Sequence, residues 1–119
     1  MKVYKTDPKA EFPTEERCNI TEVMNDPEHR EMSIAQARVL PGVRTQLHSL
    51  SDTSEVYYIL EGEGRLTVDG ASFLMHSGDS FLIKAGQSQT IENTGAIDLI
   101  FLCICRPAFE PSVYVNLEK

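Results

Sequence analysis

The sequence is poor in cysteine, has no tryptophan and contains no long apolar run. Its longest apolar stretches, around residues 56–60 and 99–105, fall far short of the ~18–20 residues that a membrane-spanning helix needs. No apolar block follows the lysines near its start, so a secretory signal peptide is not expected. We therefore expect a cytoplasmic protein with no membrane partner.

An excess of basic charge is also absent. The chain carries 11 basic and 18 acidic side chains, for a formal net charge of −7, and its basic residues form no cluster. Because nucleic-acid binding depends on a basic patch that neutralises phosphates, no nucleic-acid partner is expected. The length of 119 residues, of which 41% are apolar, suits one folded domain.

The three cysteines, Cys18, Cys103 and Cys105, are an odd number, which indicates reduced thiols rather than a disulfide framework. Cys103 and Cys105 are separated by a single residue, which differs from the spacing of a thioredoxin-like redox motif. Because alternate residues of a strand share a face, we expect both thiols on one face, where they contribute to packing.

Glycine divides the middle of the chain, and no helix of useful length is predicted there. All seven glycines lie between Gly42 and Gly95. Segments rich in Val, Ile, Leu, Phe, Tyr and Thr alternate with them: residues 55–60, 65–68, 72–75, 80–83, 89–91 and 99–105. Asp69 and Gly70 fit the central positions of a type I′ hairpin turn. The pattern predicts an all-β fold, an antiparallel sandwich or barrel.

The first third of the chain is charged and interrupted by proline. Residues 18–24 and 32–40 are predicted as two further strands, and residues 13–17 and 27–30 as helices of at most a turn or so. We interpret the chain as residues 1–37, an amino-terminal arm with strands of the same domain; residues 38–106, the core barrel; and residues 107–119, a tail packed on the barrel.

Several predicted strands are apolar on both faces. Val56 and Tyr58 alternate with Tyr57 and Ile59, and residues 99–105 are apolar throughout. A strand with one wet face shows a clean alternation, so the second face of these strands needs a cover. We expect a homodimer to supply it, since two-fold dimers are the commonest oligomers. The alternative is that the amino-terminal arm covers the face within a monomer.

Polar side chains are predicted to converge inside this barrel. His48 and Glu55 lie near the ends of successive strands joined by a polar connection, and Gln89 opens a strand after a turn that contains Gly86. A hairpin places the first two on one face. An imidazole nitrogen, a carboxylate oxygen and an amide oxygen then share one interior site.

These residues belong to two blocks that resemble the paired motifs of the cupin superfamily. The matching positions are Gly42, His48, Glu55 and Gly62 in the first block and Gly78, Gly86 and Asn93 in the second. The resemblance covers residues 38–106. It implies a cupin-type double-stranded β-helix, a jelly-roll barrel, commonly dimeric, with a site in the barrel mouth.

The chain departs from the family pattern at two ligand positions. The family's metal sites use two histidines and a glutamate from the first motif and a histidine from the second. Leu50 stands at the second histidine position here, and Gln89 at the last. The predicted ligands of a divalent metal are therefore His48, Glu55 and Gln89, a set that does not distinguish Zn, Mn, Fe and Ni. The alternative is a metal-free pocket in which His48 and Glu55 share a hydrogen bond.

Further residues are candidates for the lining of the site. Gln46 shares a strand face with His48, and Tyr57 shares one with Glu55. Arg38, if its face of the strand points inward, would clamp a carboxylate or phosphate. The alternatives are a surface arginine paired with a glutamate for Arg38 and simple packing for Tyr57.

The resemblance implies a metal-dependent, isomerase-like enzyme. A bound metal would polarise a carbonyl or hydroxyl oxygen as a Lewis acid. With no metal bound to it, Glu55 would instead serve as a base, and Tyr57 is the second candidate catalytic side chain. The expected ligand is a small polar metabolite: a sugar, a sugar phosphate or a carboxylate. Dioxygenase chemistry is less expected, because the ligands are not two histidines and a carboxylate. A metal-free binding module and a structural β-barrel dimer stay open as alternatives, so enzymatic activity is not decided by the sequence.

Overall fold

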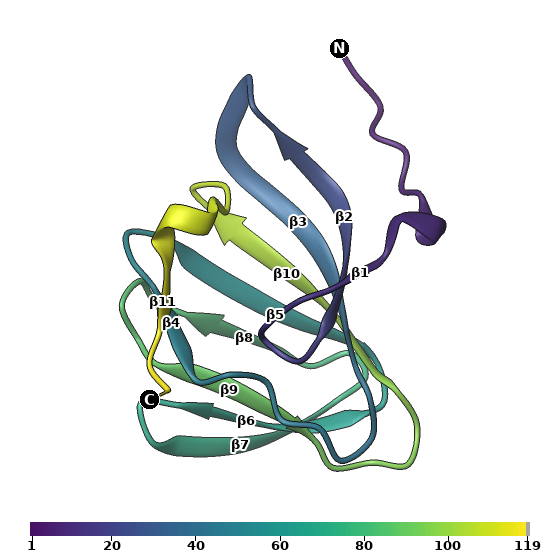
Figure 1. Ribbon diagram of the computed structural model, residues 1–119, viewed down its shortest axis with the longest axis vertical. Coiled ribbons are helices and arrows are strands. Elements are labelled where there is room, and N and C mark those ends of the chain that lie inside the picture. Colours follow the sequence, from purple (N-terminus) through teal and green to yellow (C-terminus); the bar gives the residue numbers. More distant parts are fainter. Residues whose placement is uncertain (119) are drawn as a thin grey trace.

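The computed structural model describes residues 1–118, whose regular secondary structure is almost entirely β-strand (Figure 1). The strands are β1 (Phe12–Pro13), β2 (Asn19–Asp26), β3 (His29–Val39), β4 (His48–Leu50), β5 (Ser54–Glu61), β6 (Glu63–Val68), β7 (Ala71–His76), β8 (Ser80–Ile83), β9 (Gln89–Asn93), β10 (Leu99–Arg106) and β11 (Tyr114–Asn116). Short 3-10 helices, η1 (Pro8–Ala10) and η2 (Pro111–Val113), lie near the two ends. In this part of the chain no helix has the length and apolar character to cross a membrane.

The described strands form two antiparallel sheets. The larger sheet has the order β1-β2-β3-β10-β5-β8, and the smaller sheet has the order β11-β4-β9-β6-β7. Consecutive strands such as β4 and β5, or β8 and β9, lie in different sheets, so the chain crosses repeatedly between them (Figure 1). This is the predicted jelly roll, a double-stranded β-helix. The amino-terminal strands β2 and β3 extend the larger sheet.

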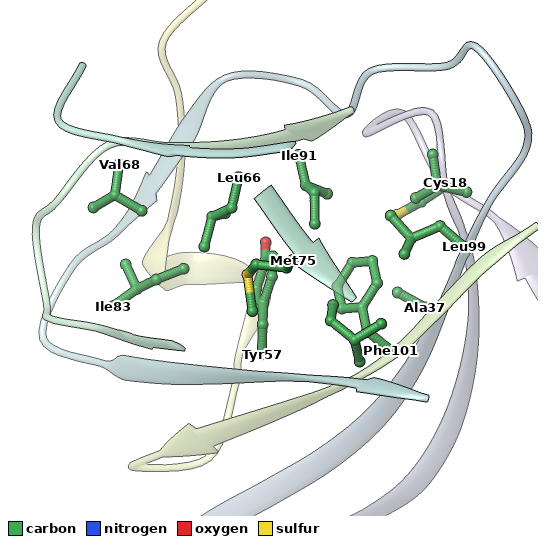
Figure 2. Close-up of a cluster of buried hydrophobic side chains, with 12 residues drawn as sticks. Cys18, Ala37, Tyr57, Leu66, Val68, Met75, Ile83, Ile91, Leu99 and Phe101 are labelled. Atoms are coloured by element: carbon green, nitrogen blue, oxygen red, sulfur yellow. The ribbon is translucent and has the colours of Figure 1, made fainter. Parts of the chain in front are cut away.

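Inward side chains of the two sheets meet in one apolar core. Leu66 and Ile91 come from the smaller sheet, and Ile83 and Phe101 from the larger one (Figure 2). All of them are almost completely buried, as the alternation of each strand requires. Phe101 also borders the buried polar side chains that gather at one end of the barrel, among them His48 and Glu55.

The hairpin between β6 and β7 confirms the predicted turn. Asp69 has a φ of 48° and Gly70 a φ of 83°, and Val68 pairs directly with Ala71. Two consecutive positive φ angles in a two-residue loop define a type I′ turn, whose twist matches that of the flanking strands.

Both ends of the chain pack onto the barrel beside its polar end. β1 pairs with β2, and β11 pairs with β4. The guanidinium of Arg17 donates two hydrogen bonds to the carboxylate of Glu118, at 3.1 and 2.7 Å. This ion pair joins the amino-terminal arm to the carboxy-terminal tail.

The two predicted short helices are wrong. Residues 27–30 belong to the tight turn and first residues of the β2–β3 hairpin, in which Asp26 pairs with His29. Residues 15–18 form a turn and bends that lead from β1 into β2. Each segment is too short to form a stable helix, because the cost of starting a helix is not recovered over one turn.

Candidate functional site

A cavity of about 130 Å³ opens between the sheets at the polar end of the barrel. Its lining comes from the inward faces of β2, β3, β5 and β10, from β4 and β11, and from the arm that precedes β2. A cavity of ~150 Å³ holds a molecule of the size of benzene, so a small metabolite fits here.

His48 on β4 presents one free ring nitrogen to this cavity. Its side chain is 4% exposed, and its Nδ1 lies 2.7 Å from the carbonyl oxygen of Gln46. A carbonyl only accepts, so Nδ1 carries the proton and Nε2 keeps its lone pair. The ring of Tyr114 stacks on the imidazole at a centroid distance of 4.6 Å. Burial lowers the pKa of His48, which favours the neutral ring.

Glu55 on β5 holds a buried oxygen with no partner. The residue is 7% exposed. The thiol of Cys105 donates to its Oε2 at 3.6 Å, and its Oε1 has no hydrogen-bond partner. Burial raises the pKa of Glu55, against smaller opposite effects of Gln89 and the cysteine thiols. A buried polar atom without a partner is costly, which makes Glu55 a candidate residue of a ligand site.

The side chains of Tyr57 and Gln89 are hydrogen-bonded to each other. The Tyr57 hydroxyl donates to Oε1 of Gln89 at 2.5 Å, and its ring stacks on Phe101 at 4.6 Å. Gln89 on β9 is the direct cross-strand partner of His48 on β4. His48, Glu55 and Tyr57 thus line one cavity, whereas Gln89 contacts Tyr57 and does not line the cavity.

The predicted donor set does not fit a resident divalent metal. The amide oxygen of Gln89 already accepts from Tyr57, and the apolar side chain of Leu50 lines the cavity where the family places a second histidine. Within residues 1–118, no group of three His, Cys, Asp or Glu side chains is arranged to hold a metal ion. His48 and Glu55 alone leave at least half of the coordination shell of such an ion unfilled.

The predicted position of Arg38 in the ligand pocket is wrong. Ala37 lines the cavity, and Arg38, its neighbour on β3, points to the opposite face of the sheet. Its guanidinium donates to Glu11 at 2.9 Å and to Asp98 at 2.8 Å. The alternative interpretation, a surface arginine paired with a glutamate, is the one that the structure has.

The side chain of Gln46 was predicted to line the ligand pocket, but Gln46 instead contacts the two aromatic residues beside it. Its side-chain oxygen accepts from the hydroxyl of Tyr114 at 2.6 Å and does not line the cavity. Its backbone carbonyl fixes the tautomer of His48. Gln46 therefore positions both rings of the stacked His48–Tyr114 pair.

Glu16 is a site residue that the sequence analysis missed. Its Oε1 lies 3.7 Å from Nε2 of His48, and its side chain is 26% exposed. Burial, with a contribution from the charge of Glu55, raises the pKa of Glu16 to about 7. Its backbone carbonyl accepts from the amide of Gln46 at 2.9 Å, which holds the arm across the cavity. Glu16 belongs to neither motif, and no signal in the sequence set it apart from Glu15.

The three cysteines also line the cavity, as free thiols. Cys103 and Cys105 share the inward face of β10, as predicted, and Cys18 faces them from the arm. Burial raises the pKa of all three thiols, that of Cys18 to about 12. They are therefore protonated, weakly polar wall groups and not activated nucleophiles.

Comparison with known proteins identifies the relatives of this chain. A family profile described as the Cupin domain matches residues 35–105. An uncharacterized protein of Methanocaldococcus jannaschii is 34% identical over 113 residues, which cover 92% of this chain and 90% of that protein. An oxalate-binding protein of Thermotoga maritima is 39% identical over 70 residues, which cover 59% of this chain and 58% of that protein.

Solved structures show the same fold. A predicted oxalate decarboxylase of Thermotoga maritima superposes with a TM-score of 0.72 at 26% identity, over 90% of this chain and 99% of that chain. The nucleoside dehydratase Pac13, from Streptomyces, superposes with a TM-score of 0.81 at 13% identity, over 98% of this chain and 92% of that chain.

Proposed function

The chain belongs to the cupin family, and we propose that it binds a small polar molecule directly in the cavity between its sheets, without a resident metal. The observation that carries the proposal is Glu55, a buried carboxyl group that lines the cavity and whose Oε1 has no hydrogen-bond partner. Burying such an atom costs free energy that a ligand donor offsets.

The two sides of the site offer different chemistry to such a molecule. Nε2 of His48 accepts a hydrogen bond from a ligand hydroxyl or amine, because the other ring nitrogen holds the proton. Glu55 in its protonated form also donates, so it is able to meet a ligand oxygen. Tyr57 holds Gln89 and is a positioning residue in this proposal, in place of the catalytic role predicted for it.

Oxalate is not the ligand that this cavity favours. The Thermotoga relative is named for binding oxalate, which is a dianion. Within residues 1–118, the cavity wall contains the carboxyl groups of Glu16, Glu22 and Glu55 and no lysine or arginine. An anion placed among them finds no opposite charge. The predicted carboxylate and phosphate ligands are disfavoured for the same reason.

We also propose a homodimer that forms through the outer face of the larger sheet. Along this face, cross-strand pairs place Ile104 beside Val56 and Val56 beside Leu82. Leu82 is 55% exposed. A continuous apolar row on a sheet surface is typical of an interface between subunits.

The free thiols fit the reducing, cytoplasmic environment expected from the sequence.

A metabolite panel with thermal unfolding as the readout tests the ligand proposal. A ligand raises the melting temperature of the wild-type protein by mass action. In Glu55→Gln, about tenfold more ligand is expected to be needed for the same rise in melting temperature, because the substitution replaces a carboxylate acceptor by an amide. Glu61→Gln is the matched control, an exposed glutamate on the same strand.

The same preparations are analysed for metals. We expect less than a stoichiometric amount of Zn, Mn, Fe or Ni in protein purified without added metal, and no stabilisation when these ions are added. One ion per chain that is lost in His48→Ala would overturn the metal-free site. No stabilisation by any metabolite would contradict ligand binding.

A further inference from the structure

The free polar atoms of the cavity are acceptors. Nε2 of His48 presents a lone pair, Oε1 of Glu55 has no partner, and Oε1 of Glu16 lies 3.7 Å from the histidine nitrogen. The three residues, on β4, β5 and the amino-terminal arm, all line the same cavity. When both carboxyl groups are ionised, a ligand that fills this space satisfies these atoms only with hydrogen-bond donors, and a cationic ligand favours that ionised form.

The donors around the cavity are largely committed to the protein itself. The hydroxyl of Tyr57 donates to Gln89, and that of Tyr114 donates to Gln46. The side-chain amide of Asn25 donates to the carbonyl of Phe109 at 3.0 Å, and the hydroxyl of Thr14 donates to the carbonyl of Cys18 at 2.8 Å. A ligand rich in acceptors therefore meets few free donors.

The charges around the cavity have one sign. Carboxyl groups reach it from Glu16 and Glu55 inside and from Glu22 at the rim. The arginines nearest in sequence turn away, since Arg17 pairs with Glu118 and Arg38 with Glu11. Aromatic rings complete the wall, among them Tyr114 over His48. Carboxylates and aromatic faces together are the surroundings that stabilise an organic cation.

We propose that the ligand of this cavity is a small molecule with a primary ammonium group, which donates its N–H bonds to Glu55, Glu16 and His48. This assignment rests on the proposed function, ligand binding in the cavity, and adds the chemical class. An ammonium has three donors and no acceptor, which complements three unpaired acceptors. The alkyl part of the ligand lies against the apolar and aromatic wall.

Propylammonium, 1-propanol and propionate test the charge preference, because they share one carbon chain and differ in the head group. Each is titrated into the ¹⁵N-labelled wild-type protein in phosphate buffer free of amines. With so few atoms, propylammonium is expected to bind with a dissociation constant of about 1 mM. We expect 1-propanol to bind about tenfold more weakly and propionate not at all. The amide signals of residues around His48 and Glu55 are expected to shift.

Glu16→Gln and its neighbour Glu15→Gln form the matched pair of variants. The affinity for propylammonium is expected to fall about fivefold or more in Glu16→Gln and to stay unchanged in Glu15→Gln, which is exposed. Equal or tighter binding of propionate or 1-propanol overturns the ammonium assignment and leaves ligand binding in the cavity standing. Failure of all three probes also overturns the assignment, and the metabolite panel then decides separately whether the cavity binds a ligand.

Discussion

Two carboxyl groups, those of Glu16 and Glu55, face one small cavity, and burial favours the protonated form of each. An unfolded glutamate ionises with a pKa of ~4.3. The pKa of Glu16 in the folded protein is about 7, so the folded state binds more protons between these values. Folding stability contributed by this group is therefore present below the unfolded pKa and is lost as the pH rises through the folded pKa.

Glu16→Gln is expected to raise the free energy of unfolding above the pKa of Glu16 and to leave it unchanged in acid. The variant removes the cost of ionising a buried group, which amounts to roughly 1–3 kcal/mol at pH ~8 and about zero at pH ~4. Urea unfolding of both proteins at a series of pH values measures the difference. Glu15→Gln, on the exposed side of the same turn, is expected to change stability little at any pH. A variant that is less stable than the wild type at high pH would contradict the placement of Glu16.

The sequence predicts those site residues whose spacing is fixed by the barrel. The hairpin expected between His48 and Glu55 is wrong, because β4 and β5 lie in different sheets. The connection between these strands is short, so it still brings the two inward side chains to the same cavity. Glu16 reaches the site through the arm, 32 positions before His48, as the numbering of the sequence gives. Its approach depends on tertiary contacts such as the hydrogen bond between Gln46 and the Glu16 carbonyl, which no local pattern encodes. Arg38 was misplaced because alternation shows which residues share a face and not which face is inside.

At the level of elements, strands were predicted well where glycine and apolar residues agree. β8 (Ser80–Ile83) has the predicted bounds, and β10 (Leu99–Arg106) is one residue longer than predicted. The short β4 (His48–Leu50) was implied only as a strand end, and β1 was missed. These short strands form because long-range partners complete their hydrogen bonds, so propensity within the segment carries little information.

Gly62 and Gly70 are glycine for different reasons in this fold. Their φ angles are 82° and 83°, so both occupy the left-handed region. A Cβ at Gly62 would lie 2.8 Å from the carbonyl oxygen of Asp98, whereas at Gly70 nothing lies within 4 Å. Gly70→Ala is expected to cost about 1–2 kcal/mol for the backbone angle alone. Gly62→Ala is expected to cost roughly 3 kcal/mol or more, because the backbone of the β9–β10 loop must also move.

Urea unfolding midpoints of the two variants measure this contrast under the same conditions. Equal destabilisation would contradict the close approach of the Gly62 backbone to the β9–β10 loop. A larger effect at Gly70 would point instead to a dominant role of the hairpin turn.

In the whole molecule, the two ends of the barrel differ in what fills them. Ile59, Leu66 and Leu99 have no exposed surface and close the core at one end. At the other end Ala35 and Ala37 present small side chains to the interior, and the space that they leave is part of the cavity. Burial of the apolar core stabilises the fold and offsets the free-energy cost of placing carboxyl groups beside the cavity.

The outer face of the larger sheet provides the test of the oligomeric state. Tyr58 on β5 is 39% exposed and pairs with Leu102 on the neighbouring strand β10. This pair lies next to the row that contains Val56 and Leu82. No charged side chain interrupts these paired positions, so two copies related by a two-fold axis bury apolar surface on both sides. The wild-type protein is expected to scatter light with twice the chain mass of 13.3 kDa. Leu82→Glu is expected to give the monomer mass, because dimerisation would bury its carboxylate unpaired.

Ile97→Glu is the matched control for this prediction. Ile97 is a large apolar side chain that is 60% exposed, but it lies in the loop between β9 and β10 and not on the outer face of the sheet. The dimer is expected to persist in this variant. A wild-type protein that is monomeric over a wide concentration range, or a loss of the dimer that is equal in both variants, would show that the sheet face is not the interface. The apolar outer positions of β5 and β10 would then be covered by something other than a second copy of the chain.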